Sequence, residues 1–380
     1  MSTYIIAEAG VNHNGSEQLA HDLVDAAADA GADAVKFQTF KASELATASV
    51  SKAKYQRQNQ TNEESQYQML ERLELRHDLH FDLKAHAEQR GIDFMSTAFD
   101  TGSLQFLVSD LSLETIKISS GELTNHPFLL AHARTGKKLI LSTGMATLDE
   151  IKDALAVLSF GFLQSAKSTE APTATTQNGY AEAPCPPTPS AFLNAYDSEH
   201  GKQLLKERLT LLHCTSEYPT SMNNVNLRVM QSLQEQFGVC VGYSDHTLGV
   251  VVAGLAVAAG ARVLEKHFTL DQSMPGPDHA MSMTPESLAR YVATAREAEL
   301  VMGSAEKMPT IGELQNRTIG RKVIVAASAI VKGEVFSDTN IGLKRSSGTG
   351  LEPSRYWELL GKQAAATIER DEAITDLLIL

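Results

Sequence analysis

Two histidines in the second half of the chain have a spacing that suits metal binding. His246 and His267 lie 21 residues apart, and each follows a short apolar run, Val239–Tyr243 or Ala261–Leu264, within three residues. The uncharged apolar segment between the runs, Leu248–Ala259, is typical of a buried helix. A strand–helix–strand unit makes its strands parallel and brings their carboxyl ends to one side of the sheet. Two neutral imidazoles meeting there would suit a divalent metal ion. Two packed or hydrogen-bonded histidines would fit the same spacing.

Two lysines indicate that an anion binds at the same end of the strands. Lys36 and Lys117 each lie on an expected strand, where an ammonium group facing the interior costs free energy unless an anion meets it. Hydroxyl side chains suited to a phosphate come from Thr97, Ser120 and Ser142. A turn or cap role is the alternative for each hydroxyl, so the interpretation depends mainly on the two lysines.

One carboxylate is expected beside the histidines. In a closed barrel the last strand neighbours the first, which would place Glu8 next to His267, where it could bind a metal ion or its water. Glu265, two residues before His267, is an alternative for the same role, but we interpret it as a member of a structural ion pair. Cys214 is interpreted as a small buried residue and not as a nucleophile, because no separate base is indicated.

The elements that would position these residues alternate regularly along the chain. Helical patterns separate eight short apolar runs, and a last helix, Pro285–Val301, follows them. The expected strands are Tyr4–Ala7, Ala34–Phe37, Asp93–Met95, Thr115–Ile118, Leu139–Leu141, Leu209–Leu212, Val239–Tyr243 and Ala261–Leu264. This alternation predicts an α/β fold, a TIM (β/α)8 barrel, whose functional groups lie at the carboxyl ends of the strands.

The sequence suggests that the chain has three parts. Residues 1–284 would form the barrel, in which 160–206 is a long insertion with an Ala-, Pro-, Thr- and Ser-rich middle that we expect to be mobile. Residues 285–318 would be a helical linker. Residues 319–380 show short β-type runs around the turn dipeptide Lys332-Gly333 and would form a small mixed domain.

The composition excludes several classes of protein. A formal net charge of −13 argues against nucleic acid or an anionic membrane as a partner. Three scattered cysteines without a C-x-x-C pattern favour reduced thiols and a cytoplasmic location. The start of the chain reads as a strand and not as a signal peptide, and no apolar run has the length of a membrane span.

The motifs in this order resemble the sialic acid synthase family, bacterial enzymes that make N-acetylneuraminate, legionaminate and pseudaminate. The matching stretches are IIAEAGVNHNGS, AGADAVKFQTF, FMSTAFD, IKISSGELTN, LILSTGMATLDEI, LLHCTSEYPT, VGYSDHTLG, EKHFTLDQSMPGPDHA and KGEVFSDTNIGLKR. They cover nearly the whole chain except 160–206, which is longer than expected for the family. The resemblance implies a C-terminal antifreeze-like (SAF) domain that caps the partner's barrel in a homodimer.

The resemblance also implies a reaction and roles for residues. Phosphoenolpyruvate would join an N-acylated mannose-type aldehyde with C–O cleavage and release of phosphate. Mn²⁺, with Mg²⁺ or Co²⁺ as alternatives, would bind to His246 and His267, with Glu8 close to its water. The phosphoenolpyruvate ligands would be Lys36, Thr97, Lys117, Ser120 and Ser142. The sugar would contact Gln38, Glu122, Ser216, Tyr218, Asp278 and, from the other subunit, Arg345. Glu122 is our hypothesis for a proton shuttle or for stabilising a cationic intermediate.

Three positions depart from the family pattern. Ala98 replaces a common proline, Ser216 replaces an asparagine seen in some members, and Ser346-Ser347 replaces the usual Pro-Gly after Arg345. We expect an N-acetylneuraminate synthase, and legionaminate synthase, which uses 2,4-diacetamido-2,4,6-trideoxymannose, is the alternative. A non-catalytic sugar-binding protein and an aldolase using pyruvate are alternatives of other classes, and release of phosphate separates both from a synthase.

Overall fold

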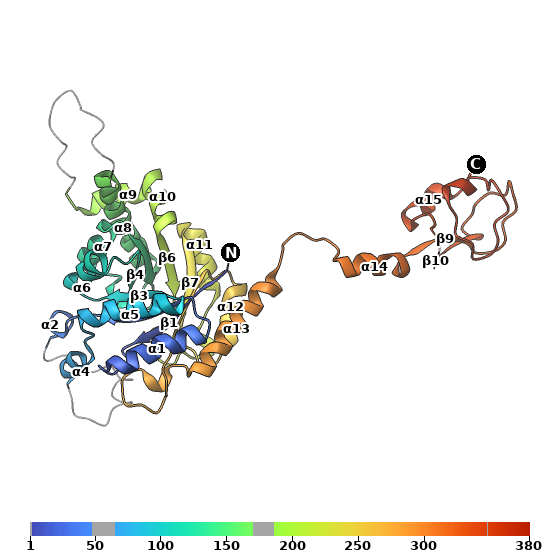
Figure 1. Cartoon of the computed structure of the whole chain (residues 1–380). Helices are drawn as coiled ribbons and strands as arrows, with labels where there is room; N and C mark the ends of the chain where they lie inside the picture. The colour runs from blue at the N-terminus through green and yellow to red at the C-terminus, as the bar shows by residue number, and fades with distance from the viewer. Residues whose placement is uncertain (1, 48–64, 170–185, 348) are drawn as a thin grey trace. The chain divides into compact units, whose positions relative to one another are not determined.

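A computed structural model describes residues 2–47, 65–169, 186–347 and 349–380 of the chain (Figure 1). The chain divides into two compact units, Met1–Gly303 and Ser304–Leu380, and each is described by itself. Within the described ranges, no helix combines the length and the apolar character needed to cross a membrane.

The first unit is a closed barrel of eight strands, in which every neighbouring pair is parallel. The strands are β1 (Tyr4–Gly10), β2 (Ala34–Thr39), β3 (Asp93–Ala98), β4 (Thr115–Ile118), β5 (Lys138–Ser142), β6 (Leu209–His213), β7 (Cys240–Asp245) and β8 (Val263–His267). The prediction of a (β/α)8 barrel is confirmed. Several strands run farther than the apolar runs that predicted them, because polar residues continue the strands at their carboxyl ends.

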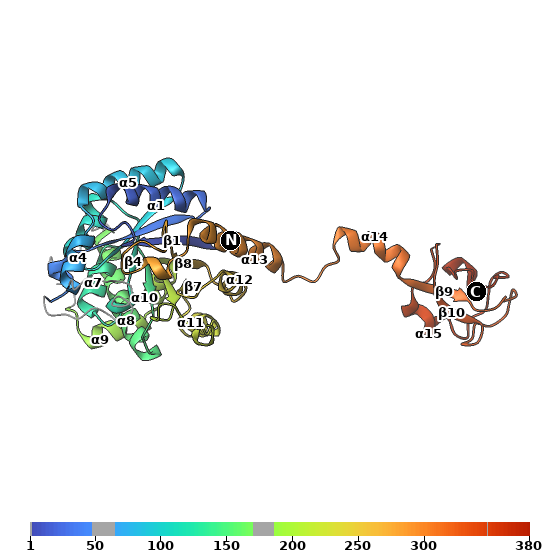
Figure 2. The same ribbon diagram turned by 90° about the horizontal axis from the view of Figure 1, so that it is seen from below.

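Helices surround the strands (Figure 2). The helices of this unit are α1 (Glu17–Asp29), α2 (Ala42–Leu45), α4 (Gln66–Leu73), α5 (His77–Arg90), α6 (Thr101–Gln105), α7 (His126–Arg134), α8 (Leu148–Thr169), α9 (Pro189–Asp197), α10 (Glu199–Arg208), α11 (Arg228–Phe237), α12 (Val251–Ala258) and α13 (Pro285–Met302). Helix α1 starts where the hydroxyl of Ser16 accepts the Leu19 amide, and α5 ends at Gly91, which has a φ of 76° that glycine adopts without strain. Helix α13 belongs to the barrel unit and packs against α12 and α1.

The region expected to be an insertion is largely helical where it is described. Helix α8 continues to Thr169 and so extends into this region instead of ending before it. Helices α9 and α10 contain most of residues 186–206. Phe162, Leu204 and Leu205 are buried in the main core. These apolar residues lie outside the Ala- and Pro-rich middle, so composition averaged over 160–206 concealed two helical flanks. Residues 170–185 lie outside the described part of the chain.

The second unit has its own core. Helix α14 (Ile311–Gly320) starts with a capping box between Thr310 and Glu313, and strands β9 (Lys322–Ala326) and β10 (Ile341–Arg345) pair antiparallel. Its buried cluster is Ile324, Ala326, Ile330, Phe336, Ile341, Leu351, Leu359, Ala364, Ile368 and Ile374. A short helix α15 (Tyr356–Leu359) follows these strands. The small mixed domain expected from the sequence is therefore present as a compact unit.

Candidate active site

The inside of the barrel is built in layers, because alternate residues of a strand face the same side. One layer is apolar and consists of Ile6, Ala34, Met95, Ile140, Leu212 and Val263, which form a single buried cluster. Two residues farther along the same strands come Glu8, Lys36, Thr97, Ser142, Cys214 and Glu265. The lining of the barrel therefore changes from apolar to polar between one layer of side chains and the next, towards the carboxyl ends of the strands.

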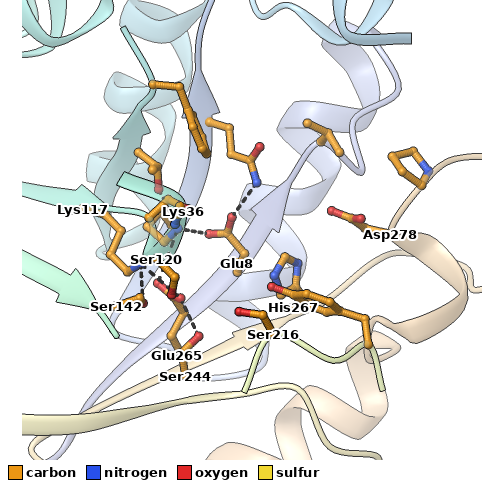
Figure 3. Close-up of a pocket in the computed structure, with 18 of the residues that line it drawn as sticks. Glu8, Lys36, Lys117, Ser120, Ser142, Ser216, Ser244, Glu265, His267 and Asp278 are labelled. Carbon is orange, nitrogen blue, oxygen red and sulfur yellow. Dashed lines mark hydrogen bonds and ion pairs between the residues drawn. The ribbon is translucent and has the colours of Figure 1, made fainter. Parts of the chain in front are cut away.

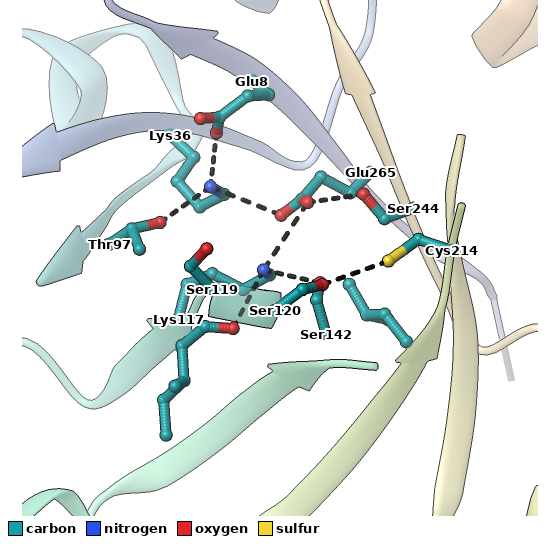
Figure 4. A network of polar contacts seen from close by, with 12 residues as sticks. Glu8, Lys36, Thr97, Lys117, Ser119, Ser120, Ser142, Cys214, Ser244 and Glu265 are labelled. Carbon is teal, nitrogen blue, oxygen red and sulfur yellow. Dashed lines mark hydrogen bonds and ion pairs between the residues drawn. The ribbon is translucent and has the colours of Figure 1, made fainter. Parts of the chain in front are cut away.

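The polar layer is an ion network that contains two buried ammonium groups (Figure 4). The Nζ of Lys36 lies 2.5 Å from the Oε2 of Glu8 and 3.4 Å from the Oε2 of Glu265. The same ammonium donates a hydrogen bond to Thr97 Oγ1 at 2.9 Å. The Nζ of Lys117 donates to Ser142 Oγ at 2.7 Å and lies 3.7 Å from Glu265 Oε1. Glu265 therefore joins both lysines.

Burial and charge act on these groups in opposite directions. Burial alone would raise the pKa of Glu265, but the ammonium groups of Lys117 and Lys36 outweigh it and lower that pKa. Burial raises the pKa of Glu8 to about 7, although Lys36 opposes this shift. Burial lowers the pKa of Lys117, and the negative charge of Glu265 offsets this shift only in part. Of these two ammonium groups, Lys117 would therefore gain more from a bound anion.

A glycine lets three polar side chains approach one another beside Lys117. A Cβ at Gly144 would lie 2.5 Å from Ser216 Oγ and 3.0 Å from both Cys214 Sγ and Ser120 Oγ, so no larger residue fits. The Gly144 amide donates to Ser120 Oγ at 2.9 Å. Cys214 is 5% exposed and contacts Ser120 Oγ at 3.3 Å. The thiol is thus a small buried side chain at the cavity wall, as interpreted from the sequence.

His246, directly after β7, and His267, the last residue of β8, lie close together at the same end of the barrel. Their ring centroids are 5.7 Å apart, and Tyr218 packs against both rings. His246 Nδ1 donates to the carbonyl of Thr215 at 2.7 Å, which leaves Nε2 with its lone pair. His267 Nδ1 is buried and has no hydrogen-bond partner among the described residues. Burial lowers the pKa of both imidazoles, that of His267 to about 3.

This donor set fits a metal ion in part. Neutral imidazoles with one ring nitrogen fixed by a backbone carbonyl are typical of metal ligands. However, no group of three or more His, Cys, Asp or Glu side chains in the described ranges has a metal-binding arrangement. The chain would therefore supply two ligands from this pair, and other oxygen atoms would have to complete the coordination.

All these groups line one cavity of about 440 Å³ (Figure 3). The cavity brings together twelve of the residues singled out from the sequence: Glu8, Lys36, Gln38, Thr97, Lys117, Ser120, Ser142, Ser216, Tyr218, His246, His267 and Asp278. Gln38 Nε2 donates to Glu8 Oε1 at 3.3 Å, and burial raises the pKa of Asp278 to about 6. In the view of Figure 3, Lys117 and Asp278 lie at opposite ends of the group.

Two residues expected at the site are not among the cavity's lining residues. Glu122 is half-buried at the end of the short 3-10 helix Ser120–Glu122, and its Oε2 accepts a hydrogen bond from Asn125 at 2.7 Å. Arg345 lies on β10 in the second unit, where its Nε donates to the Gly320 carbonyl at 3.1 Å. The roles expected for these two residues stay predictions.

Several lining residues were not expected from the sequence. Ser244 precedes His246 by two residues, as Glu265 precedes His267, so the strand period could have identified it as well. Glu265 is an ion-pair residue, as interpreted, but it also faces the cavity. The apolar lining from α2, α4 and the residues after β1 and β3 had no such signal, because only the folded chain brings these segments together.

A (β/α)8 barrel with a polar cavity at the carboxyl ends of its strands has the architecture typical of enzymes of this fold. Comparison with protein families places the chain among them. The NeuB family matches residues 23–307 and the SAF domain matches residues 321–379. The chain therefore belongs to the NeuB family, the sialic acid synthases, and carries a C-terminal SAF domain, as the motifs predicted. It is an enzyme of sialic-acid-type sugar biosynthesis.

The similarity to known proteins extends over the whole chain. The N,N′-diacetyllegionaminic acid synthase of Legionella pneumophila is 43% identical over 97% of this chain and 92% of its own length. The enzyme of the same name from Campylobacter jejuni is 43% identical over 98% of this chain and 99% of its own. The solved structure of N-acetylneuraminic acid (sialic acid) synthetase from Leptospira borgpetersenii in complex with citrate is 28% identical, covering 83% of this chain and 90% of that one, with a TM-score of 0.62.

Proposed function

We propose that the enzyme condenses phosphoenolpyruvate with 2,4-diacetamido-2,4,6-trideoxymannose to give N,N′-diacetyllegionaminate and phosphate. The observation that supports the reaction class is the pair of buried ammonium groups, Lys36 and Lys117, in the same cavity as two neutral imidazoles. The choice of sugar rests on the 43% identity to two N,N′-diacetyllegionaminic acid synthases, against 28% to the N-acetylneuraminic acid synthetase. The preference expected from the motifs alone, N-acetylmannosamine, becomes the second candidate.

The phosphate of phosphoenolpyruvate would bind between the lysines. A phosphate oxygen can replace the carboxylates now paired with Lys36 and Lys117, since charge-assisted hydrogen bonds to anions are strong in a buried site. Thr97, Ser120 and Ser142 hold hydroxyl groups at the same end of the cavity and would donate to the remaining oxygens. The formal charge of the chain is −13, so attraction of the anion must come from this local pair.

The aldehyde would bind at the histidine side of the cavity. His246 and His267 would hold a divalent ion, Mn²⁺ in our proposal with Mg²⁺ and Co²⁺ as alternatives, with Glu8 nearby. When bound, the ion supplies Lewis-acid polarisation of the aldehyde oxygen. Sugar hydroxyl and amide groups would contact the side chains of Gln38, Ser216, Tyr218 and Asp278. Arg345 would reach the N-acetyl group from the partner subunit of a homodimer.

Bond formation between C3 of the enolpyruvyl group and the aldehyde carbon leaves a cationic centre at C2. Water then adds to C2, and the resulting tetrahedral intermediate expels phosphate with cleavage of the C2–O bond. A carboxylate with a pKa near 7 is suited to take the proton of that water at neutral pH, which favours Glu8 as the base. Glu122 stays our hypothesis for moving a proton or stabilising the cation.

A phosphate-release assay tests this proposal. Phosphoenolpyruvate is incubated with each of the two aldehydes and Mn²⁺, and a chelator serves as the control. We expect release that requires aldehyde and metal and is faster with the 6-deoxy sugar. Phosphoenolpyruvate labelled with ¹⁸O in the C2–O bridge should deliver the label to phosphate. No release with any mannosamine derivative would instead favour a non-catalytic sugar-binding protein, and unlabelled phosphate would contradict C–O cleavage.

A further inference from the structure

One side of the cavity is apolar and comes from outside the barrel strands. It is formed by Val11, Leu45, Met69, Leu70, Leu73 and Phe99, which we call the apolar wall. These residues belong to a small hydrophobic cluster that is separate from both the main core and the apolar layer of the barrel. Met69 and Leu73 are each only 1% exposed and nevertheless line the cavity. The wall is therefore a packed surface that a bound molecule would contact.

Contacts between three segments hold the apolar wall in place. The Glu74 carboxylate at the end of α4 accepts the Ala42 amide of α2 at 2.7 Å and pairs with Lys41 at 3.1 Å. On the other side, a Cβ at Gly15 would lie 2.7 Å from the Arg72 carbonyl, so the segment after β1 approaches α4 too closely for a side chain. Helix α4 starts with a capping box between Ser65 and Gln68. The position of the wall is thus fixed by the chain itself.

The chemistry of the wall limits which part of a sugar it can accept. None of its six side chains offers a hydrogen-bond donor or a carboxylate, amide or hydroxyl acceptor. A sugar hydroxyl buried against it would lose its hydrogen bonds to water without replacement. A methyl group buried there loses nothing and gains from leaving water. The polar groups of the same cavity lie on the barrel strands or in the segments that follow them, and would face the phosphate and the aldehyde.

We propose that the apolar wall is the subsite for the methyl-bearing end of an N-acylated 6-deoxy sugar and selects this sugar against one with a hydroxymethyl group. This inference rests on the proposed function and names the residues that decide between its two candidate aldehydes. A methyl-sized difference in an apolar pocket changes kcat/KM by roughly tenfold or more. The wall residues lie outside the barrel strands that carry Lys36 and Lys117, so a change in the wall should leave the binding of phosphoenolpyruvate intact.

The test changes the polarity of the wall and compares two sugars. The full-length variant Leu70→Asn should lower the ratio of kcat/KM for the 6-deoxy sugar over N-acetylmannosamine by about tenfold, with an unchanged KM for phosphoenolpyruvate. Leu70→Met should keep the ratio of the wild type. Leu193→Asn replaces a leucine of α9 that is 43% exposed outside the cavity, and it is the matched control. Leu45→Asn on α2 repeats the test from a second element in case Leu70→Asn does not fold.

A binding measurement keeps this inference separate from the proposed reaction. The two sugars reduced to their alditols cannot react. They differ at C4 as well as at C6, so the readout is the ratio of their affinities, and calorimetry should show that the preference of the wild type for the 6-deoxy alditol falls about tenfold in Leu70→Asn. If neither aldehyde releases phosphate but Leu70→Asn still lowers this preference, the proposed function fails and the subsite stands. If turnover occurs with the same sugar ratio in the wild type, Leu70→Asn and Leu45→Asn, the subsite is refuted and the reaction stands.

Discussion

Lys36 and Glu265 form an ion pair inside the barrel, with Nζ and Oε2 3.4 Å apart and both side chains at most 5% exposed. Glu265 also reaches Lys117 and accepts a hydrogen bond from Ser244 at 2.8 Å. Glu265 therefore contributes to the compensation of both buried positive charges, together with Glu8 at Lys36. The groups of this network depend on one another, because removing one partner leaves a buried charge uncompensated and destabilises the fold.

The first prediction follows from this shared carboxylate. Glu265→Gln should lower the free energy of unfolding by about 3 kcal/mol, because Lys117 loses its carboxylate partner and Lys36 keeps only Glu8. Added inorganic phosphate should raise the melting temperature of the variant more than that of the wild type. Glu114→Gln breaks an exposed ion pair with Lys137 and should change stability by less than about 0.5 kcal/mol. Equal effects of the two substitutions would contradict the bridging role of Glu265.

A second prediction concerns the ammonium group with the weaker compensation. Lys117→Met should raise the KM for phosphoenolpyruvate by roughly thirtyfold, which corresponds to the loss of about 2 kcal/mol from a charged hydrogen bond. Steady-state kinetics at several phosphoenolpyruvate concentrations measure this change. Lys84→Met removes a lysine that pairs with Glu88 on the surface of α5, and it should behave as the wild type. A rise in the KM for the sugar alone would place the phosphate elsewhere.

A third prediction concerns metal binding. Chelation should abolish phosphate release, and Mn²⁺ should restore it. His246→Asn and His267→Asn should each weaken Mn²⁺ binding at least tenfold by calorimetry, because each removes one of two expected ligands. His213 is bonded to the Val225 carbonyl at 2.9 Å and does not line the cavity, so His213→Gln is the matched control. Full activity after exhaustive chelation would refute the metal-dependent reaction.

A fourth prediction concerns pH and a histidine outside the site. His132 on α7 is fully buried, and burial lowers its pKa from 6.5 to about 4. Because the pKa is lower in the folded protein than in the unfolded chain, the contribution of the neutral imidazole to stability is fully present above pH 6.5. This contribution is lost as the pH falls towards 4. Between pH 7.5 and 5 this histidine should remove about 2 kcal/mol from the free energy of unfolding. Urea unfolding measures this change. Between the same two pH values, the free energy of unfolding of His132→Leu should fall by about 2 kcal/mol less than that of the wild type. Parallel curves of unfolding free energy against pH for the two proteins would contradict the prediction.

A fifth prediction tests the action of Arg345 across subunits. At a phosphoenolpyruvate concentration well below the KM of Lys117→Met, this variant and Arg345→Ala should each have little activity alone. When the two variants are refolded together, hybrid dimers would contain one barrel with Lys117 and one partner arginine at the same cavity. Activity should therefore recover to roughly a quarter of the wild type, since half of the dimers are hybrids with one complete site. A monomer with full activity, or no recovery on mixing, would exclude the arrangement.

Much of the site could be predicted from the sequence because strands impose a period of two. Once eight strands are recognised, residues such as Lys36 and Lys117 must face either the interior or the helices, and only an interior with an anion suits them. The same rule could have added Ser244, which precedes His246 by two residues. The boundaries were less certain, because α8 continues through a region whose average composition is polar and proline-rich.

By itself, the sequence determined the barrel, the family and the face on which each polar strand residue lies, since these depend on local periodicity and on the order of motifs. Only the tertiary structure decided which of these groups meet. Closure of the barrel makes Glu265 a neighbour of both lysines, and packing of α2 and α4 places Leu45 and Leu70 against the same cavity. Distances between segments far apart in the chain are set by packing, which local patterns do not encode.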